Sequence, residues 1–476
     1  MLFNSIEFLW FFPLVTTLFF LLPHRMRWAL LLGSSCYFYM CFIPEYILIL
    51  LGTIIIDYIA GILIEGASGK RRRIYLAASI VANVGVLAVF KYFNFANSSL
   101  ASLATAIGWN YSIDSLSIIL PVGLSFHTFQ AMSYTFEVYY GRQQAERHFG
   151  IYALYVMFYP QLVAGPIERP QNLLPQFHSQ QRFDWHRAWD GMTLMLWGLF
   201  KKVVIADRLA IYVDAVYGNP AGHSGADMVV ATYCFAIQIF CDFSGYSDIA
   251  IGSARVMGFK LMNNFRMPYL SQSVREFWQR WHISLSTWFR DYLYIPLGGN
   301  RLGRWRYHRN ILLTFTISGL WHGASWTFVV WGALHGLFVI AETAFDARGS
   351  TVANQNSAEA RGVAGRFLRI FLTFHLVLIA WVFFRANSFA DAWTILSGAM
   401  QSNIGDLIAL NVSFAPARDL MLMLGIILAA GFWESNAPRL TPKLSPLIRL
   451  LALSLQFWLI VIYGVFNTRQ FIYFQF

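Results

Sequence analysis

Long apolar runs, separated by short polar loops, repeat along almost the whole chain. Most of them approach the length of about 20 residues that an α-helix needs to cross the hydrocarbon core of a membrane. The pattern therefore predicts an all-α polytopic membrane protein with about eleven crossings. The runs lie at 8–22, 28–42, 46–64, 74–89, 116–140, 189–217, 228–257, 311–340, 367–384, 420–433 and 448–466.

Two segments depart from simple crossings. Residues 151–163 are apolar but too short to cross, and they lead into Ala164-Gly-Pro-Ile-Glu-Arg-Pro170. Because irregular backbone at membrane depth must be buried in protein, we expect a re-entrant segment here. The run 311–340 is interpreted as two limbs that return to one side, with Trp321-His-Gly-Ala-Ser325 at their junction. A single straight span is the alternative.

Composition supports the membrane assignment. The chain is 57% hydrophobic and 12% charged, with a mean hydropathy of +0.50. Soluble domains carry about 25% charged residues, so this chain lacks the polar surface to cover a globule in water. We find no repeat of fixed period and no soluble domain, and we expect 346–365 to be a hydrophilic loop. Residues 1–476 are thus expected to form a single integral-membrane domain, with a motif-dense core at 120–345.

Basic residues indicate the orientation of the helices. The net charge is +11, and the basic loops at 24–27, 70–73 and 141–147 alternate with the neutral loops at 43–45 and 94–117. By the positive-inside rule, the basic loops are cytoplasmic and the N-terminus is outside. The cation-rich segment 258–309 is then cytoplasmic as well. This distribution explains the positive charge without nucleic acid as a partner. The first run is expected to remain as a helix, because Met1–Trp10 lacks the basic region of a cleavable signal.

Most common catalytic signatures are absent from the sequence. The four cysteines lie inside apolar runs without metal-ligand spacing, and no P-loop or GxGxxG string occurs. No metal site is therefore expected. His186-Arg-Ala-Trp-Asp-Gly191 matches the HxxxDG string of certain soluble acetyltransferases, but those enzymes are mixed α/β folds and this string begins a membrane helix. Asp242 and Asp248 lie at membrane depth and need partners, through packing or through a direct catalytic role.

The stretch from Arg275 to Gly336 is the strongest candidate for chemistry. His322 lies inside an apolar run, where a charged side chain costs about 2.5–3.5 kcal/mol. A neutral imidazole is well suited to accept a proton from a hydroxyl as a general base. The alternative is a hydrogen-bonded interior histidine with no chemical role. The many arginines and aromatic residues that precede His322 favour the catalytic interpretation.

A second histidine, His282, lies in Trp281-His-Ile-Ser-Leu-Ser-Thr-Trp288, which is predicted to be helical. Glu276 and Arg280 have the i, i+4 spacing of an ion pair. Arg290-Asp291 and the arginines from Arg301 to Arg309 are candidates to bind the phosphates of an anionic cofactor at the cytoplasmic mouth. The alternative is an interfacial amphipathic helix with an aromatic belt.

These residues resemble the bacterial membrane-bound O-acyltransferase family, and most of all its alginate O-acetyltransferase branch. The similarity runs over nearly the whole chain and includes Leu162-Val-Ala-Gly-Pro166 and Asp242-Phe-Ser-Gly-Tyr-Ser-Asp-Ile-Ala-Ile-Gly252. It also includes the string from Arg280 to Arg301 and Gly319-Leu-Trp-His-Gly-Ala324. The resemblance implies a ring of membrane helices with re-entrant segments around a central funnel. It further implies that His322 and His282 are catalytic. The residues expected to bind the cofactor are Arg280, Trp281, Ser284, Trp288, Arg290, Asp291 and Arg301.

The resemblance also implies a reaction. Family members take an acyl group from a cytoplasmic donor, here acetyl-CoA, and pass it to the outer side of the bacterial inner membrane. The expected recipient is a periplasmic acetyltransferase of the SGNH type or a similar partner, which modifies an exported polysaccharide. Alginate is the favoured polymer, with cellulose and peptidoglycan as alternatives. A non-catalytic transporter or scaffold is the alternative of a different class, although a transporter is expected to show a symmetric repeat.

Overall fold

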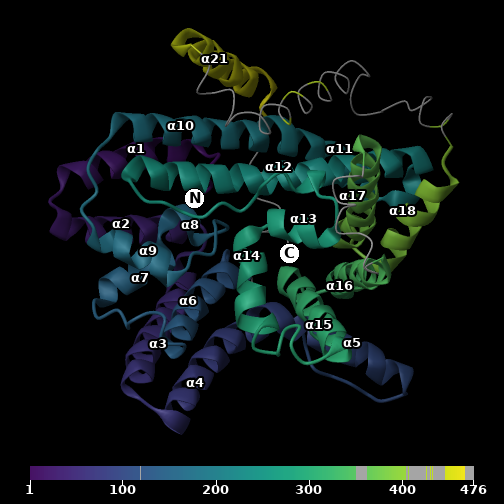
Figure 1. Cartoon of the computed structure of the whole chain (residues 1–476), viewed down its shortest axis with the longest axis horizontal. Helices are drawn as coiled ribbons and strands as arrows, with labels where there is room; N and C mark the ends of the chain where they lie inside the picture. The colour runs from purple at the N-terminus through teal and green to yellow at the C-terminus, as the bar shows by residue number, and fades with distance from the viewer. Residues whose placement is uncertain are drawn as a thin grey trace. The chain divides into compact units, whose positions relative to one another are not determined.

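The computed structural model describes residues 1–117, 120–349, 362–403 and 445–466, and the single positions 406, 425, 429 and 431. Across these residues the regular structure is helical, without a strand (Figure 1). The all-α fold class is therefore confirmed. Most of the predicted run at 420–433 and most of the predicted loop at 346–365 lie outside the described residues.

Several helices are long and apolar enough to cross a membrane. Within the described ranges there are five: Pro44–Gly66, Gly69–Ala106, Gly225–Met257, Trp326–Phe345 and Val363–Arg385. Two shorter apolar helices span Ile6–Leu21 and Leu447–Tyr463. The chain is thus a multi-pass membrane protein, and the count of about eleven crossings remains a prediction.

The described chain divides into two compact units, each discontinuous in sequence. Unit 1 contains residues 1–195 and 246–263, and unit 2 contains residues 196–245 and 264–466. The helices of unit 1 are α1 (Ile6–Leu21), α2 (His24–Met40), α3 (Ile47–Gly66), α4 (Gly69–Leu87), α5 (Phe93–Ala106), α6 (Leu124–Tyr139), α7 (Phe149–Met157), α8 (Tyr159–Leu162), α9 (Pro170–His178) and most of α10 (Trp185–Phe200).

One predicted loop of unit 1 is largely helical. Helix α4 continues through a π-helical segment, Ala88–Tyr92, directly into α5. The prediction of a loop from residue 94 is therefore wrong as far as Ala106. Residues 93–106 contain neither proline nor glycine to end the helix. The helix ends just before Gly108, which has a φ of 72° and so adopts the left-handed conformation common after helix C-termini.

The short apolar segment 151–163 is buried inside unit 1. It forms α7 and α8, which are separated by a break at Phe158. Ser35 Oγ on α2 accepts a hydrogen bond of 3.0 Å from the backbone N–H of Tyr159 beside this break. The Tyr155 hydroxyl donates to the backbone oxygen of Glu168 at 2.8 Å. Protein groups thus bind backbone groups beside the break, and the re-entrant placement of this segment stays a prediction.

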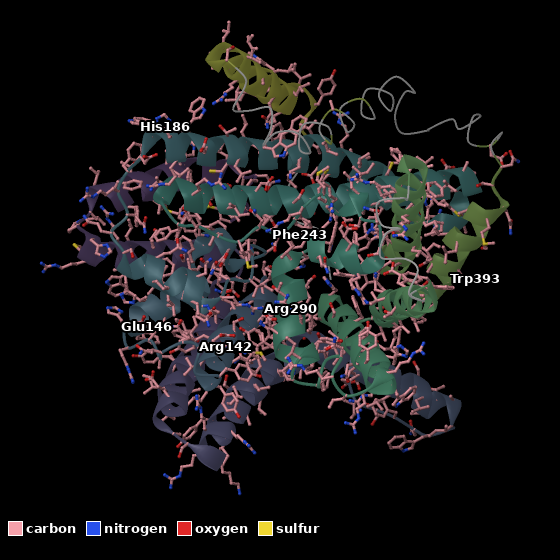
Figure 2. The ribbon with its side chains drawn as sticks, in the orientation of Figure 1. Arg142, Glu146, His186, Phe243, Arg290 and Trp393 are labelled. Carbon is pink, nitrogen blue, oxygen red and sulfur yellow. The ribbon has the colours of Figure 1, made fainter. Side chains whose placement is uncertain are left out.

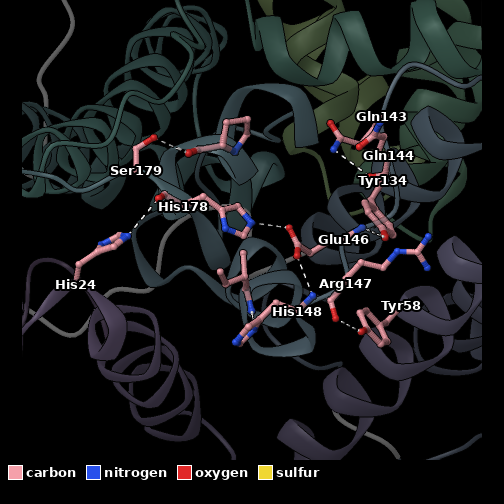
Figure 3. A network of polar contacts seen from close by, with 12 residues as sticks. His24, Tyr58, Tyr134, Gln143, Gln144, Glu146, Arg147, His148, His178 and Ser179 are labelled. Atoms are coloured by element: carbon pink, nitrogen blue, oxygen red, sulfur yellow. Dashed lines mark hydrogen bonds and ion pairs between the residues drawn. The ribbon is translucent and has the colours of Figure 1, made fainter.

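A polar network joins the loop after α6 to neighbouring parts of unit 1 (Figure 3). Its centre is Glu146, whose Oε2 lies 2.8 Å from His178 Nε2 and whose Oε1 accepts from the backbone N–H of His148 at 2.8 Å. The backbone N–H of Glu146 donates to the Tyr134 hydroxyl at 2.9 Å. Arg147 in the same loop pairs with Glu65. The basic loop 141–147 is therefore fixed to the helices around it.

Unit 2 holds the rest of the chain. Its helices are the end of α10, the π-helical segment Lys201–Ala206, α11 (Asp207–Gly218), the first part of α12 (Gly225–Met257), α13 (Val274–Arg280), α14 (Ile283–Phe289), the π-helical segment Arg290–Tyr294, α15 (Arg304–His322), α16 (Trp326–Gly349), α17 (Val363–Arg385), α18 (Phe389–Gln401) and α21 (Pro446–Tyr463).

The apolar run 311–340 consists of two helices, as the two-limb interpretation predicts. Helix α15 ends at His322 and α16 begins at Trp326, so the junction is the expected Trp321–Ser325 stretch. The two helices pack closely because glycines lie at their contact. A Cβ atom added to Gly332 would lie 2.2 Å from the backbone oxygen of Phe315 and 3.1 Å from the Cα of Gly319. Any larger residue at position 332 would push the two helices apart.

We predict that Gly332→Ala lowers the melting temperature of the purified protein. Backbone atoms of α15 cannot move aside as a flexible side chain can, and overpacking costs about 1–3 kcal/mol. Gly52→Ala on α3 is the matched control, since nothing lies within 4 Å of its added Cβ. Thermal unfolding in detergent measures both variants. Equal melting temperatures for the two would contradict the close packing of α15 on α16.

Candidate functional site

His282 and His322 lie side by side in unit 2. Their ring centroids are 6.5 Å apart, although 40 residues separate them in the chain. His322 is the last residue of α15, and His282 precedes the first turn of α14 as its N-cap. His282 is fully buried and His322 is only 4% exposed. Two histidines that were predicted separately thus share one buried site.

The backbone at His282 is left-handed, with φ 41° and ψ 56°. The prediction of one helix through residues 281–288 is therefore wrong, because α13 ends at Arg280 and α14 starts at Ile283. A left-handed conformation costs a non-glycine residue about 1–2 kcal/mol and must be held by its surroundings. Asn264 holds it: its backbone oxygen accepts from Ile283 N at 2.9 Å, and its Oδ1 accepts from Ser284 N at 3.3 Å.

Aromatic rings enclose the His282 imidazole. The Phe243 ring on α12, labelled in Figure 2, meets it at a centroid distance of 4.5 Å and an angle of 88°. The Trp321 ring, on the helix α15 that ends at His322, has its centroid 6.3 Å from that of His282. Burial lowers the pKa of His282 to about 3, because the charged imidazolium loses its hydration. The imidazole is therefore neutral at physiological pH.

His322 also lies among aromatic rings. Trp321, Trp331 and Phe384 approach it with centroid distances of 4.9, 5.0 and 5.5 Å, each with a steep angle between the ring planes. Trp331 comes from α16 and Phe384 from α17, so three helices of unit 2 contribute to this wall. Such a wall restricts the orientation of the imidazole and keeps bulk water away from it.

A third histidine, His335 on α16, belongs to the same cluster. Its Nδ1 accepts a 3.2 Å hydrogen bond from the indole Nε1 of Trp278, so the neutral ring carries its proton on Nε2. Its ring centroid is 5.1 Å from that of Trp331. Sequence reasoning gave His335 no role. The available signal was that this residue is the second histidine in the run 311–340.

A cavity of about 360 Å³ lies in unit 2 near this cluster. Two of its residues lead toward His322. Ser318 is one helical turn before His322 on α15, and the Trp278 ring is 5.7 Å from the Trp331 ring, which contacts His322. The lining residues are Arg275, Trp278, Leu285, Ser286, Phe289, Arg290, Tyr294, Asn300, Tyr307, Ile311, Thr314, Phe315, Ser318 and Val339.

The cavity combines an apolar wall with two guanidinium groups. Arg275 donates to the hydroxyls of Tyr307 and Thr343, at 3.2 Å each. Arg290, labelled in Figure 2, is mostly exposed, and its Nε donates to Asp291 Oδ1 at 2.8 Å. Such a site fits a ligand with an apolar chain and a negatively charged head.

The structure distributes the predicted cofactor-binding residues over several environments. Arg290 lines the cavity, and Asp291 is its ion-pair partner. Arg280 forms the predicted i, i+4 pair with Glu276. The remaining four do not line this cavity: Trp281, Ser284 and Trp288 are buried, and Arg301 is exposed.

Two further motifs have local explanations. Asp242 on α12 pairs with the buried Lys202, which also lies 2.9 Å from Asp207 Oδ1. This contact supports a packing role for Asp242, one residue before Phe243. His186 of the HxxxDG string, labelled in Figure 2, and Asp190 are both exposed on α10, so they form no enclosed site.

Comparison with known proteins finds a matching family and several similar relatives. Residues 146–383 match the model of the MBOAT, membrane-bound O-acyltransferase family. The chain is 38% identical to a probable alginate O-acetylase of Azotobacter vinelandii, over 93% of this chain and 87% of the relative. A probable alginate O-acetylase of Pseudomonas aeruginosa is 39% identical over 86% of this chain and 77% of its own length. A peptidoglycan O-acetyltransferase of Helicobacter pylori is 33% identical over 78% of this chain and 73% of its own length.

The backbone at His282 can be tested through stability alone. We predict that His282→Gly has a higher melting temperature than His282→Ala, although alanine is normally the more stabilising residue. Both variants lose the imidazole, but only glycine adopts the left-handed conformation without strain, a difference of about 1–2 kcal/mol. Thermal unfolding compares the two proteins. A more stable alanine variant would show that this backbone is not left-handed.

Proposed function

Because the chain belongs to the membrane-bound O-acyltransferase family, we propose that it transfers acetyl from cytoplasmic acetyl-CoA for O-acetylation of an exported polysaccharide. The observation that carries this proposal is the meeting of His282 and His322 in a buried aromatic site, 6.5 Å apart. Alginate is the favoured polymer, since relatives named as alginate O-acetylases are 38% and 39% identical. Peptidoglycan is the second candidate, favoured by the Helicobacter relative, and cellulose is the third.

His322 acts as the general base in this proposal. It takes the proton of an acceptor hydroxyl while the hydroxyl oxygen attacks the carbonyl carbon of the acetyl thioester. The carbon–sulfur bond then breaks, and the CoA thiolate leaves with the electron pair and receives from His322 the proton that His322 took from the hydroxyl. His282 has a different role, because an imidazole with a pKa of about 3 is a poor base at neutral pH. As a neutral group it orients the acceptor by hydrogen bonding.

The cavity in unit 2 is the proposed binding site for acetyl-CoA. Its volume of about 360 Å³ and its apolar lining suit the pantetheine arm of the donor. Arg275 and Arg290 supply positive charge for the phosphates. A donor held there approaches His322 from the side of Ser318 and Trp278. A transporter or scaffold function, in contrast, does not require two buried histidines beside such a cavity.

The remaining features of the proposal concern the membrane and its partners. The helices form a ring of about eleven crossings around a funnel in the bacterial inner membrane. The segment 258–309 faces the cytoplasm, where acetyl-CoA is present, by the positive-inside rule. The acetyl group leaves on the periplasmic side through a partner acetyltransferase of the SGNH type or a similar protein. Acetylation of the polymer is then indirect.

The first test removes the proposed base. We expect His322→Ala to lose acetyl transfer by about 10²–10⁴-fold, the usual contribution of a general base, while the protein still inserts in the membrane. His186→Ala is the matched control, because His186 is an exposed histidine outside the site. The assay measures O-acetyl groups on alginate and on peptidoglycan from cells that produce each variant. Near-normal acetylation by a well-expressed His322→Ala protein rules out this role.

The second test concerns the donor. We expect Arg290→Gln and Arg275→Gln to raise the KM for acetyl-CoA with little change in kcat, because phosphate contacts stabilise the bound donor and the transition state equally. The effect should weaken at high salt, which screens exposed charges. Arg304→Gln tests the competing prediction from the sequence that Arg301 to Arg309 bind the phosphates, since Arg304 is exposed on α15 and does not line the cavity. An equal rise in KM for Arg304→Gln would place the phosphates outside the cavity.

A further inference from the structure

The indole N–H of Trp331 is a buried donor without an acceptor. Trp331 is 1% exposed, and its Nε1 has no hydrogen-bond partner among the residues that the structure describes. Buried tryptophan N–H groups usually find a partner, because an unsatisfied buried donor is unfavourable. Trp278 in the same cluster follows this rule, since its Nε1 donates to His335. The unsatisfied N–H of Trp331, next to His322, therefore requires an explanation.

The position of Trp331 suggests what the acceptor is. Its ring lies 5.0 Å from the ring of His322 and 5.7 Å from the ring of Trp278, which lines the cavity. Trp331 thus joins the wall of the proposed donor cavity to the proposed base. A thioester that reacts with a hydroxyl at His322 must bring its carbonyl group to this same junction.

We infer that Trp331 is a catalytic residue whose indole N–H donates a hydrogen bond to the carbonyl oxygen of the acetyl group. This inference rests on the proposed acetyl transfer. When the acceptor oxygen bonds to the carbonyl carbon, the π electron pair of the carbonyl moves onto its oxygen and forms an oxyanion. The pair returns to the carbonyl as the carbon–sulfur bond breaks, and the thiolate leaves with the bonding pair. The N–H therefore binds the carbonyl oxygen most strongly after the attack and before the carbon–sulfur bond breaks.

Burial increases the value of this contact. A fixed donor in a water-excluded site stabilises developing negative charge more than the same donor in water, and it needs no reorganisation during the reaction. Aromatic rings surround Trp331, including His335 at 5.1 Å and Phe384 at 5.1 Å. These contacts hold the indole in one orientation. In the free enzyme this N–H is unbound, which is unfavourable. The oxyanion removes that penalty when it accepts the hydrogen bond, so the site binds the oxyanion more strongly.

Trp381 provides a matched comparison. It is also fully buried, its Nε1 also lacks a partner within the described part of the chain, and its ring stacks on that of Trp331 at 5.8 Å. Its nearest ring contacts include Trp281 and Phe384, at 5.1 Å each. No ring contact links Trp381 with His322 in the described residues. We therefore assign the oxyanion contact to Trp331 and none to Trp381.

The test removes the N–H and keeps the aromatic ring. Full-length wild type, Trp331→Phe and Trp381→Phe are compared in membranes of alginate-producing cells, which supply the partner and the polymer, with kcat and KM for acetyl-CoA measured separately as acetyl transferred to alginate. A third variant, Trp331→benzothienylalanine, replaces the N–H with sulfur and preserves the shape of the indole, so it decides the question if Trp331→Phe folds poorly. We expect both changes at position 331 to lower kcat by about 10²-fold, as the loss of one oxyanion donor does, with KM for acetyl-CoA unchanged.

The outcomes separate the inference from the function on which it rests. A wild-type protein that transfers no acetyl refutes the proposed function. If the wild type is active and Trp331→benzothienylalanine retains its kcat, the function stands and the role of Trp331 is refuted. That result would be expected if the indole N–H points at a neighbouring ring. A loss confined to Trp381→Phe, or a change in KM alone at position 331, also refutes the assignment.

Discussion

Asn264 holds the chain directly after one backbone turn, and the candidate site depends on that turn. Its two hydrogen bonds, to the N–H groups of Ile283 and Ser284, start a new helix directly after His282. His282 therefore takes the left-handed conformation, which is unfavourable for any residue with a Cβ atom. Strain of this kind persists only where the surroundings determine the backbone, and it is often found at functional sites. Here it occurs at the residue that faces His322.

The second requirement of the site is the burial of polar groups in an apolar environment. Aromatic rings surround His282, His322 and His335. The rings exclude water, and the same exclusion makes each remaining hydrogen bond more valuable. The His335 ring makes one such bond, because its Nδ1 accepts from the indole N–H of Trp278. The indole N–H of Trp331 has no acceptor among the described residues. In the proposed mechanism the carbonyl oxygen of the reacting acetyl group supplies that acceptor.

A charge cluster in unit 2 supports the wall beside His282. Lys202 contacts both Asp207 and Asp242, and all three side chains are buried. Gly245, one turn further along α12, lies close to the end of α10, since an added Cβ would lie 2.7 Å from the backbone oxygen of Gly198. These contacts fix the position of α12 in unit 2, and Phe243 lies between Asp242 and Gly245. The packing of Phe243 on His282 thus depends on an ion pair that involves neither catalytic candidate.

The sequence by itself determined the membrane character and the helical class, and it proposed His322 and His282 as candidates. Hydropathy depends on composition within about 20 residues, and a titratable residue such as His322 is visible in an apolar run. Helix ends and the break at His282 were not predictable from periodicity. In residues 281–288 the apolar and polar positions fit a helix, and the break is stabilised by Asn264, which lies earlier in the chain.

Only the tertiary structure decided which residues meet. The 6.5 Å contact between His282 and His322, and the contacts of Trp331 and Phe384 with His322, join segments that local patterns treat as independent. The cavity likewise selects Arg275 and Arg290 from a long series of arginines that the sequence could not rank. The physical reason is that packing between distant helices depends on shape and close approach, as at Gly319 and Gly332. Local hydropathy and spacing carry no information about such contacts.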